Sequence, residues 1–159
     1  DARRMLLATC RERGIPVLTA APLGMGVALL YFSPTGMSFE DYFRVDGHES
    51  QEQYARFIAG LSPAMVQRDY LVAPDAVNFT QKRGPSTVMA CDLCAGVMGT
   101  SVLKVLLGRG TMKAAPWGMQ FDAYHQTLRM TWRPFGNSNP FQQLLLKFIR
   151  PKLRGRADA

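Results

Sequence analysis

Residues 14–34 read GIPVLTAAPLGMGVALLYFSP, and this stretch decides the fold. Two short apolar runs, 15–20 and 26–32, lie on either side of a glycine-containing loop. Apolar runs of this length, bounded by glycine and proline, are typical of buried strands. We expect the first to pair in parallel with a strand earlier in the sequence and the second to end at the turn 33–36.

The loop triplet Gly24-Met25-Gly26 resembles the start of a phosphate-binding fingerprint. That fingerprint needs a third glycine and a following helix. Here Leu29 occupies the place of the third glycine, and a strand pattern follows. The sequence therefore offers no loop that would cradle the phosphates of a nucleotide.

The remaining segments alternate between helical and strand patterns. A helix is expected over 2–13, before Gly14, and the strongest helix over 86–107, with Ser86 as its cap and Gly108 at its end. The other expected elements are helices at 38–43, at 49–60 with Tyr54, Phe57 and Ile58 inward, and at 141–150 ending at Pro151, a hairpin of strands 119–124 and 127–132, and an irregular segment at 62–85.

Composition is that of one folded domain over residues 1–159, with 47% apolar and 19% charged residues. No uninterrupted apolar run reaches about 18 residues, so neither a transmembrane helix nor a membrane partner is expected. No secretory signal is visible and three cysteines form no disulfide framework, which predicts a cytoplasmic location. The chain opens at Asp1 inside a helical pattern, so we expect it to be part of a longer protein.

Positive charge is concentrated at the C-terminal end. The whole chain carries +7, and residues from Arg133 onward carry +5, from six basic residues and one acid. The segment 134–159 is therefore expected to be a basic helix and tail. A solvated end that docks on its own domain is the favoured interpretation, and contact with an anionic surface or nucleic acid is the alternative.

Cys91 and Cys94 have the spacing of zinc sites and thiol–disulfide enzymes. Zinc needs two further ligands at suitable spacing, and a redox pair belongs at a helix start rather than inside an apolar run. We therefore predict no metal site and favour packing, in which the small residues Cys91, Ala95 and Gly99 form a smooth helix row.

Asp122, His125 and Ser138 are the acid, base and nucleophile types that lie near one another in the sequence. The first two flank an expected hairpin turn, and nothing fixes a nucleophile beside a base. The catalytic residues are therefore unknown from the sequence.

The order of the segments resembles the second half of the ThiF/MoeB/HesA superfamily, adenylyltransferases related to ubiquitin-activating enzymes. The resemblance covers about residues 1–36 and 90–133. It rests on a helix with Arg3 and Cys10, on the stretch 14–34, on AGVMGTSVLKVLLGRG at 95–110, and on MQFDAYHQTLRMTWR at 119–133 with its Phe121-Asp122 pair.

The resemblance implies the C-terminal half of a Rossmann-like α/β domain, with a mixed sheet and a closing hairpin. Complete members bind ATP with magnesium and adenylate a carboxylate, often the C-terminal glycine of a ubiquitin-like or sulfur-carrier protein. The nucleotide-binding residues would precede Asp1, so no cofactor is expected for this chain alone. The triplet Gly24, Met25 and Gly26 would lie near the groove for the acceptor tail.

This sequence departs from the family pattern in two ways, so the zinc-binding and reactive-cysteine roles of family members are not assigned to its residues. The paired CxxC zinc knuckles of several members are absent, and Cys91 and Cys94 fall too late to match the reactive cysteine of others. The resemblance allows a homodimer and does not suggest nucleic acid as a partner. The alternative function is that of a non-catalytic, degenerate member that serves as a partner-binding subunit.

Overall fold

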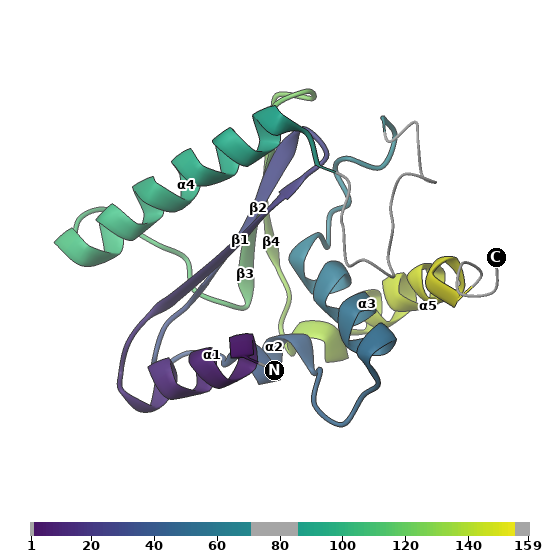
Figure 1. Ribbon diagram of the computed structural model, residues 1–159, viewed down its shortest axis with the longest axis horizontal. Helices are drawn as coiled ribbons and strands as arrows, with labels where there is room; N and C mark the ends of the chain where they lie inside the picture. The colour runs from purple at the N-terminus through teal and green to yellow at the C-terminus, as the bar shows by residue number, and fades with distance from the viewer. Residues whose placement is uncertain (1, 71–85, 155–159) are drawn as a thin grey trace.

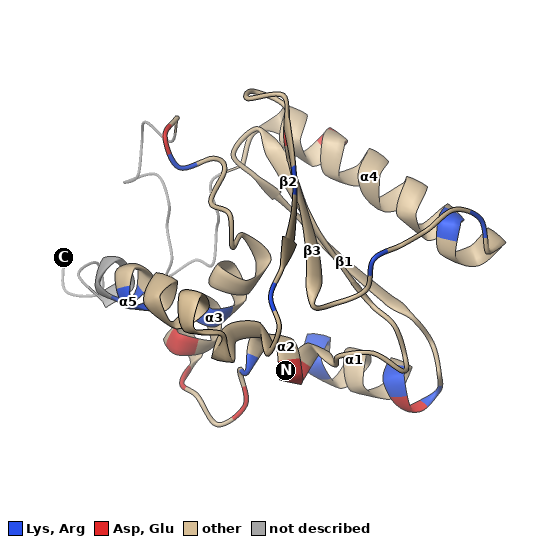
Figure 2. Ribbon diagram, turned by 180° about the vertical axis from the view of Figure 1, so that it is seen from behind, with Lys and Arg blue, Asp and Glu red and all other residues tan. Residues whose placement is uncertain are grey.

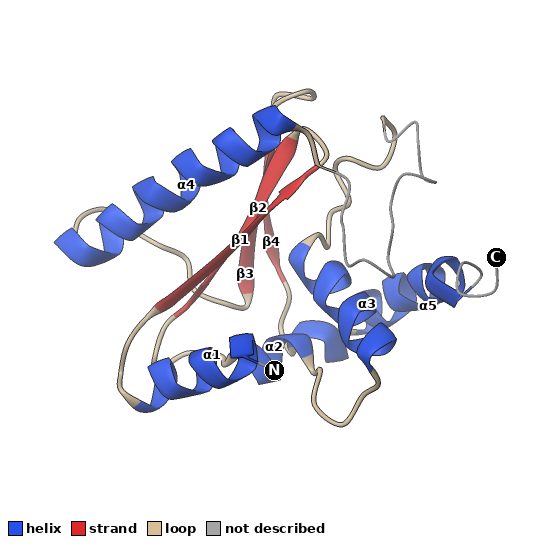
Figure 3. Ribbon diagram, viewed as in Figure 1, coloured by secondary structure: helices blue, strands red, loops and turns tan. Residues whose placement is uncertain are grey.

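The computed structural model describes residues 2–70 and 86–154 and has one four-stranded sheet with helices on both faces (Figures 1 and 3). The strands follow one another across the sheet in chain order. The elements are α1 (Ala2–Glu12), β1 (Val17–Leu23), β2 (Gly26–Phe32), α2 (Phe39–Phe43), α3 (Ser50–Leu61), α4 (Val88–Leu107), β3 (Trp117–Asp122), β4 (Thr127–Trp132), the 3-10 helix η2 (Gly136–Ser138) and α5 (Pro140–Arg154).

The α/β class is confirmed, but the sheet is not mixed within the described residues. All three strand pairs are antiparallel, and the parallel contact seen there is a single bridge between Gly24 and Ser86. The first strand continues past Ala20 to Leu23 and pairs with β2, so Gly24 and Met25 form a two-residue hairpin turn. Glycine at the first turn position, with φ +59°, permits this tight connection.

The two faces of β2 divide the protein into two layers. One face presents Ala28, Leu30 and Phe32 to the main core, which α1 and α2 cover together with the end of α3. Tyr42 and Phe43 of α2 are almost fully buried there, and Phe32 packs against both rings. The alternation of side chains along the strand directs the other residues of β2 toward α4.

Within the described residues, α4 packs mainly on β1 and β2 and leaves the same face of β3 and β4 largely uncovered (Figures 1 and 2). Thr87, rather than the expected Ser86, caps it by accepting the N–H of Ala90, while Gly108 ends it as predicted. By length and composition α4 could cross a membrane, and only 11% of its most apolar stretch is buried inside the structure. The sequence pattern did not indicate a possible membrane span, because Asp92 and Lys104 interrupt the apolar run of this helix.

The other elements follow the predicted pattern with shifts at their ends. β3 begins at Trp117 and ends at Asp122, two residues earlier at each end than expected. On α3, the small residues Ala55, Ala59 and Gly60 are buried, whereas the three larger residues expected inside are half-buried. Residues 62–70 consist mainly of turns, and 71–85 of the expected irregular segment lie outside the described residues.

α5 docks on α3, as the favoured interpretation of the C-terminal helix required. Leu146 is fully buried against Ala55 and Ala59. The helix does not end at Pro151 but continues to Arg154. A proline removes one hydrogen-bond donor from the helix while its fixed φ remains helical, so the helix can pass through it.

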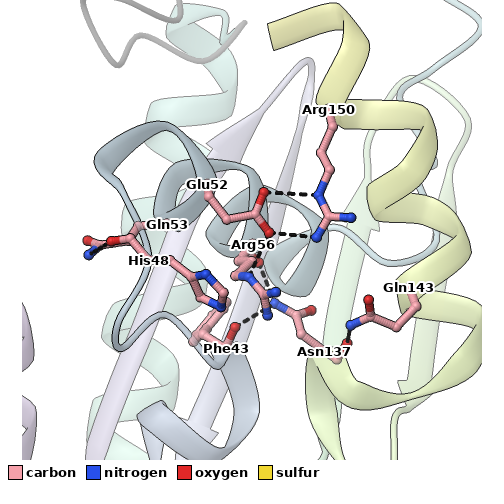
Figure 4. A network of polar contacts seen from close by, with 8 residues as sticks. All are labelled: Phe43, His48, Glu52, Gln53, Arg56, Asn137, Gln143 and Arg150. Atoms are coloured by element: carbon pink, nitrogen blue, oxygen red, sulfur yellow. Dashed lines mark hydrogen bonds and ion pairs between the residues drawn. The ribbon is translucent and has the colours of Figure 1, made fainter. Parts of the chain in front are cut away.

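A buried polar network joins α2, α3, η2 and α5 (Figure 4). Asn137, fully buried, donates its amide to the carbonyls of Phe43 at 2.8 Å and Arg56 at 2.7 Å. Arg150 binds Glu52 through two hydrogen bonds, of 2.9 and 2.7 Å. These contacts set the angle at which α5 lies on α3.

Candidate acceptor-binding site

The β1–β2 turn is where the sequence predicted an acceptor-tail groove, at Gly24, Met25 and Gly26. A Cβ on Gly24 would lie 2.5 Å from the hydroxyl of Tyr70, and one on Gly26 would overlap the Phe121 carbonyl of β3. The two glycines therefore make room for other parts of this chain. Their contact with an acceptor stays a prediction.

Tyr70 fastens this turn to the end of β3. The Met25 N–H donates to the Tyr70 hydroxyl oxygen over 2.8 Å, and the hydroxyl donates to the Asp122 carboxylate. Asp122 is almost fully buried, and its second oxygen accepts the backbone N–H of His125 at 2.9 Å. Burial and the bond to Asp122 raise the pKa of Tyr70 to about 12. The phenol is therefore neutral at physiological pH and remains a hydrogen-bond donor.

His125 lies between two carboxylates. Its Nε2 is 3.1 Å from an oxygen of Asp69, and its Nδ1 is 3.4 Å from an oxygen of Asp122. Ser138 does not join them, because it belongs to η2, which follows β4 at the other end of the sheet (Figure 1). The structure thus brings together two of the three residues that the sequence grouped, without the nucleophile.

A groove of about 720 Å³ runs between α4 and the uncovered part of the sheet. Large apolar side chains extend from it over β4: Leu128, Met130 and Trp132 are 59%, 41% and 55% exposed. The groove is lined mainly by Leu29, Tyr31, Met119 and Met130 from the sheet, by Leu93 and Val97 from α4, and by Lys104 and Lys113. Contiguous exposed apolar surface of this kind marks an interaction site.

The N-terminal end of α4 adjoins the β1–β2 turn. The N–H and the hydroxyl of Thr87 both donate to the Gly24 carbonyl, at 3.0 and 3.1 Å. A second pocket, of about 480 Å³, reaches Leu23 and Ser86 at this same corner and includes Arg3 and Arg4 in its wall. The corner at Gly24 therefore borders an arginine-bearing pocket.

The arginines of this pocket have defined contacts. Arg4 pairs with Glu40 and, at 2.7 Å, with Asp46, and its hydrogen bond to Asp46 lowers the pKa of that carboxyl. The Arg3 guanidinium lies 4.9 Å from the centre of the Phe57 ring. The pocket thus combines an apolar wall with two arginines, of which Arg4 is already paired with two carboxylates.

The ThiF family model matches residues 1–142, which is most of the chain. The chain belongs to the ThiF family. A search of curated proteins found no match. The ThiF match ends near the start of α5, so the rest of that helix lies outside the part that the family model describes.

The described residues of this ThiF member do not fit ATP and magnesium. The Gly24–Gly26 turn belongs to an antiparallel hairpin and is filled by Tyr70, so its backbone cannot cradle phosphates as a strand-to-helix loop does. No group of three or more His, Cys, Asp or Glu residues in the described ranges is placed to hold a metal ion. We therefore derive no catalytic step that passes through ATP or magnesium from these residues.

The thiol of Cys94 shows no sign of activation in this ThiF member. Burial raises the pKa of Cys94, with a smaller contribution from the neighbouring Cys91 thiol, so the reactive thiolate is disfavoured. The predicted packing row was wrong, because Cys91, Ala95 and Gly99 are all exposed. The side of α4 that faces the sheet carries Ala90 and Ser101 instead.

Proposed function

We propose that this chain is part of an ATP-dependent ThiF-type adenylyltransferase and that its described residues hold the acceptor. The acceptor would be a protein with a free C-terminal carboxylate, of the ubiquitin-like or sulfur-carrier kind. The observation that supports this is the apolar groove beside α4, which continues over the exposed side chains of β4. A flat apolar sheet face suits a small folded carrier better than it suits a small molecule.

In this reaction, a carboxylate oxygen of the acceptor bonds to the α-phosphorus of ATP and pyrophosphate leaves. The residues of this chain would bind and orient the acceptor, while ATP and magnesium would be held by residues outside it. The carrier body would cover Met119 and Met130, and its extended tail would pass the Gly24 corner toward the pocket of Arg3 and Arg4.

Charge beside the groove indicates what kind of carrier fits. Two cations, Lys104 and Lys113, and one acid, Asp92, line it, and Lys113 lies 4.2 Å from the centre of the Trp117 ring. A carrier with an apolar patch bordered by acidic residues would complement both features. This prediction narrows the choice of probe to acidic ubiquitin-like proteins.

The test is calorimetric titration of the chain with an acidic ubiquitin-like carrier that ends in Gly-Gly. We expect Met130→Glu, which places a charge in the groove, to weaken binding by about tenfold or more. Leu106→Glu, on the outer face of α4, is the matched control and should bind as the wild type does. Equal affinity for wild type and Met130→Glu would show that the groove is not the binding surface.

A second candidate function is that of a non-catalytic partner-binding subunit, with which the lack of fit to ATP among the described residues agrees equally well. It shares the acceptor surface but not the chemistry. ATP–pyrophosphate exchange by the full-length protein distinguishes the two, because only the enzyme exchanges. A cytoplasmic location and a homodimer are further parts of the proposal, which fractionation and light scattering would test.

A further inference from the structure

α5 presents two different faces. The inner face is fixed to α3 by the fully buried Leu146, by Gln142, whose amide donates to the Ala59 carbonyl at 2.9 Å, and by the pairing of Arg150 with Glu52 (Figure 4). The rotation of the helix about its axis is therefore fixed. Its opposite side must face away from the protein.

That outer side carries a stripe of large apolar residues. Phe141, Leu144 and Phe148 are 75%, 52% and 66% exposed. Their spacing of three and four residues places them in line along one side of the helix. Lys147, also exposed, lies beside Leu144 and Phe148 on the same turn of the helix. This pattern is typical of a helix that buries two faces. Within the described residues, only the inner face packs against another element.

The sequence around the stripe is rich in cations. Residues from Arg133 onward carry +5, and Arg150, which Glu52 neutralises, is only one of the six basic residues. Lys152, Arg154 and Arg156 follow the stripe directly in the sequence, with Asp158 as the one acid. An apolar stripe followed by cations complements a surface that is anionic outside and apolar beneath.

We propose that α5 rests on an anionic lipid surface, with Phe141, Leu144 and Phe148 in the acyl boundary and Lys147 among the headgroups. A lipid surface fits better than a nucleic acid, because contact with a phosphate backbone would not bury the apolar stripe. It also fits better than an acidic protein, because a convex row of side chains needs a matching groove in a protein but none in a bilayer. The helix is about 22 Å long and would lie along the surface rather than cross it.

The C-terminal helix differs from what the sequence predicted. A membrane partner was not expected, since the helix appeared to end at Pro151 and to use its apolar residues for docking. The structure extends the helix to Arg154 and shows that docking uses only one of its two apolar faces. Because the ThiF match ends at residue 142, Leu144, Lys147 and Phe148 lie beyond the part of the chain that the family model covers.

Vesicle co-sedimentation of the 159-residue chain tests the proposal. Vesicles of phosphatidylcholine with about one-third phosphatidylserine should bind at least tenfold more strongly than pure phosphatidylcholine. Phe148→Ser should weaken binding to the anionic vesicles by about tenfold, and so should Lys147→Glu. Leu6→Ser, a similarly exposed apolar residue on α1, is the matched control and should not change binding.

Each other outcome overturns the proposal. Equal binding to both vesicle types, or no binding, would remove the lipid surface as the partner. A loss with Lys147→Glu but not with Phe148→Ser would indicate recognition of charge alone, as by a nucleic acid. A change in oligomeric mass with Phe148→Ser, without a change in vesicle binding, would assign the stripe to a second protein chain. Circular dichroism melts show whether each variant is folded.

Discussion

Replacing Asn137 with alanine tests whether the buried network holds the C-terminal helix in place. The Asn137 side chain is fully buried, donates two hydrogen bonds and accepts a third from Gln142 at 3.3 Å. The two carbonyls that it satisfies belong to Phe43 at the end of α2 and Arg56 within α3. Alanine would remove both donors and leave a small cavity.

The expected loss of stability follows from these partners. The Phe43 carbonyl ends α2 and would lose a buried partner, which costs about 1–3 kcal/mol. The Arg56 carbonyl lies within α3 and keeps its helical partner, so its loss is smaller, at about 0.5–1.5 kcal/mol. Together they give about 3 kcal/mol, which lowers the melting temperature of a domain of this size by roughly 6–12 °C.

Urea unfolding followed by circular dichroism would measure this change. Ser138→Ala is the matched control, since Ser138 is the exposed neighbour of Asn137 in the same 3-10 helix and should change stability by less than about 0.5 kcal/mol. A loss below about 1 kcal/mol for Asn137→Ala, with an unchanged slope, would refute the reasoning. In that case the network would not be what orients α5.

Three further predictions concern the turn and the titrating groups. Gly24→Ala should destabilise more than Gly47→Ala in thermal melts, because both have positive φ but only Gly24 has Tyr70 in the way; equal losses would contradict this. The raised pKa of Tyr70 contributes stability that is complete below about pH 10 and is lost as pH rises toward about 12. Tyr70→Phe should therefore make the alkaline loss of stability smaller. Some loss should remain, because the pKa of Tyr42 is also raised to about 12. Hydrogen bonds to its arginine partners lower the pKa of Glu52, so the stability that its carboxylate contributes is present above about pH 4.5 and lost below. Glu52→Gln should therefore flatten the acid limb of a curve of unfolding free energy against pH. An unchanged acid limb would show that Glu52 does not contribute to acid unfolding.

Local patterns were enough to predict most of the fold. The apolar runs around the glycine loop gave two strands, and Gly14 and Gly108 ended their helices as expected. The partner of the first strand could not be predicted, because an apolar run looks the same in a parallel and in an antiparallel sheet. The two-residue turn at Gly24 made the antiparallel pairing available.

The site was less accessible to sequence reasoning. Asp69 and Tyr70 occur in a segment with no periodicity, and only the fold places them beside Asp122 and His125. The exposed face of α4 was mistaken for its packed face, because a helix that is apolar all round gives no direction from its sequence. The groove forms because α4 packs on two strands and not on the other two. Such tertiary packing could not be predicted from local sequence patterns.

ATP–pyrophosphate exchange by the full-length protein tests the central claim most directly. With an acidic ubiquitin-like carrier that ends in a free Gly-Gly carboxylate, we predict carrier-dependent exchange that falls about tenfold or more in Met130→Glu and is unchanged in Leu106→Glu. Loss of exchange when the C-terminal carboxylate of the carrier is amidated would complete the prediction. Absence of exchange with any such carrier, or full exchange by Met130→Glu, would contradict an adenylyltransferase that holds its acceptor on this face of the sheet.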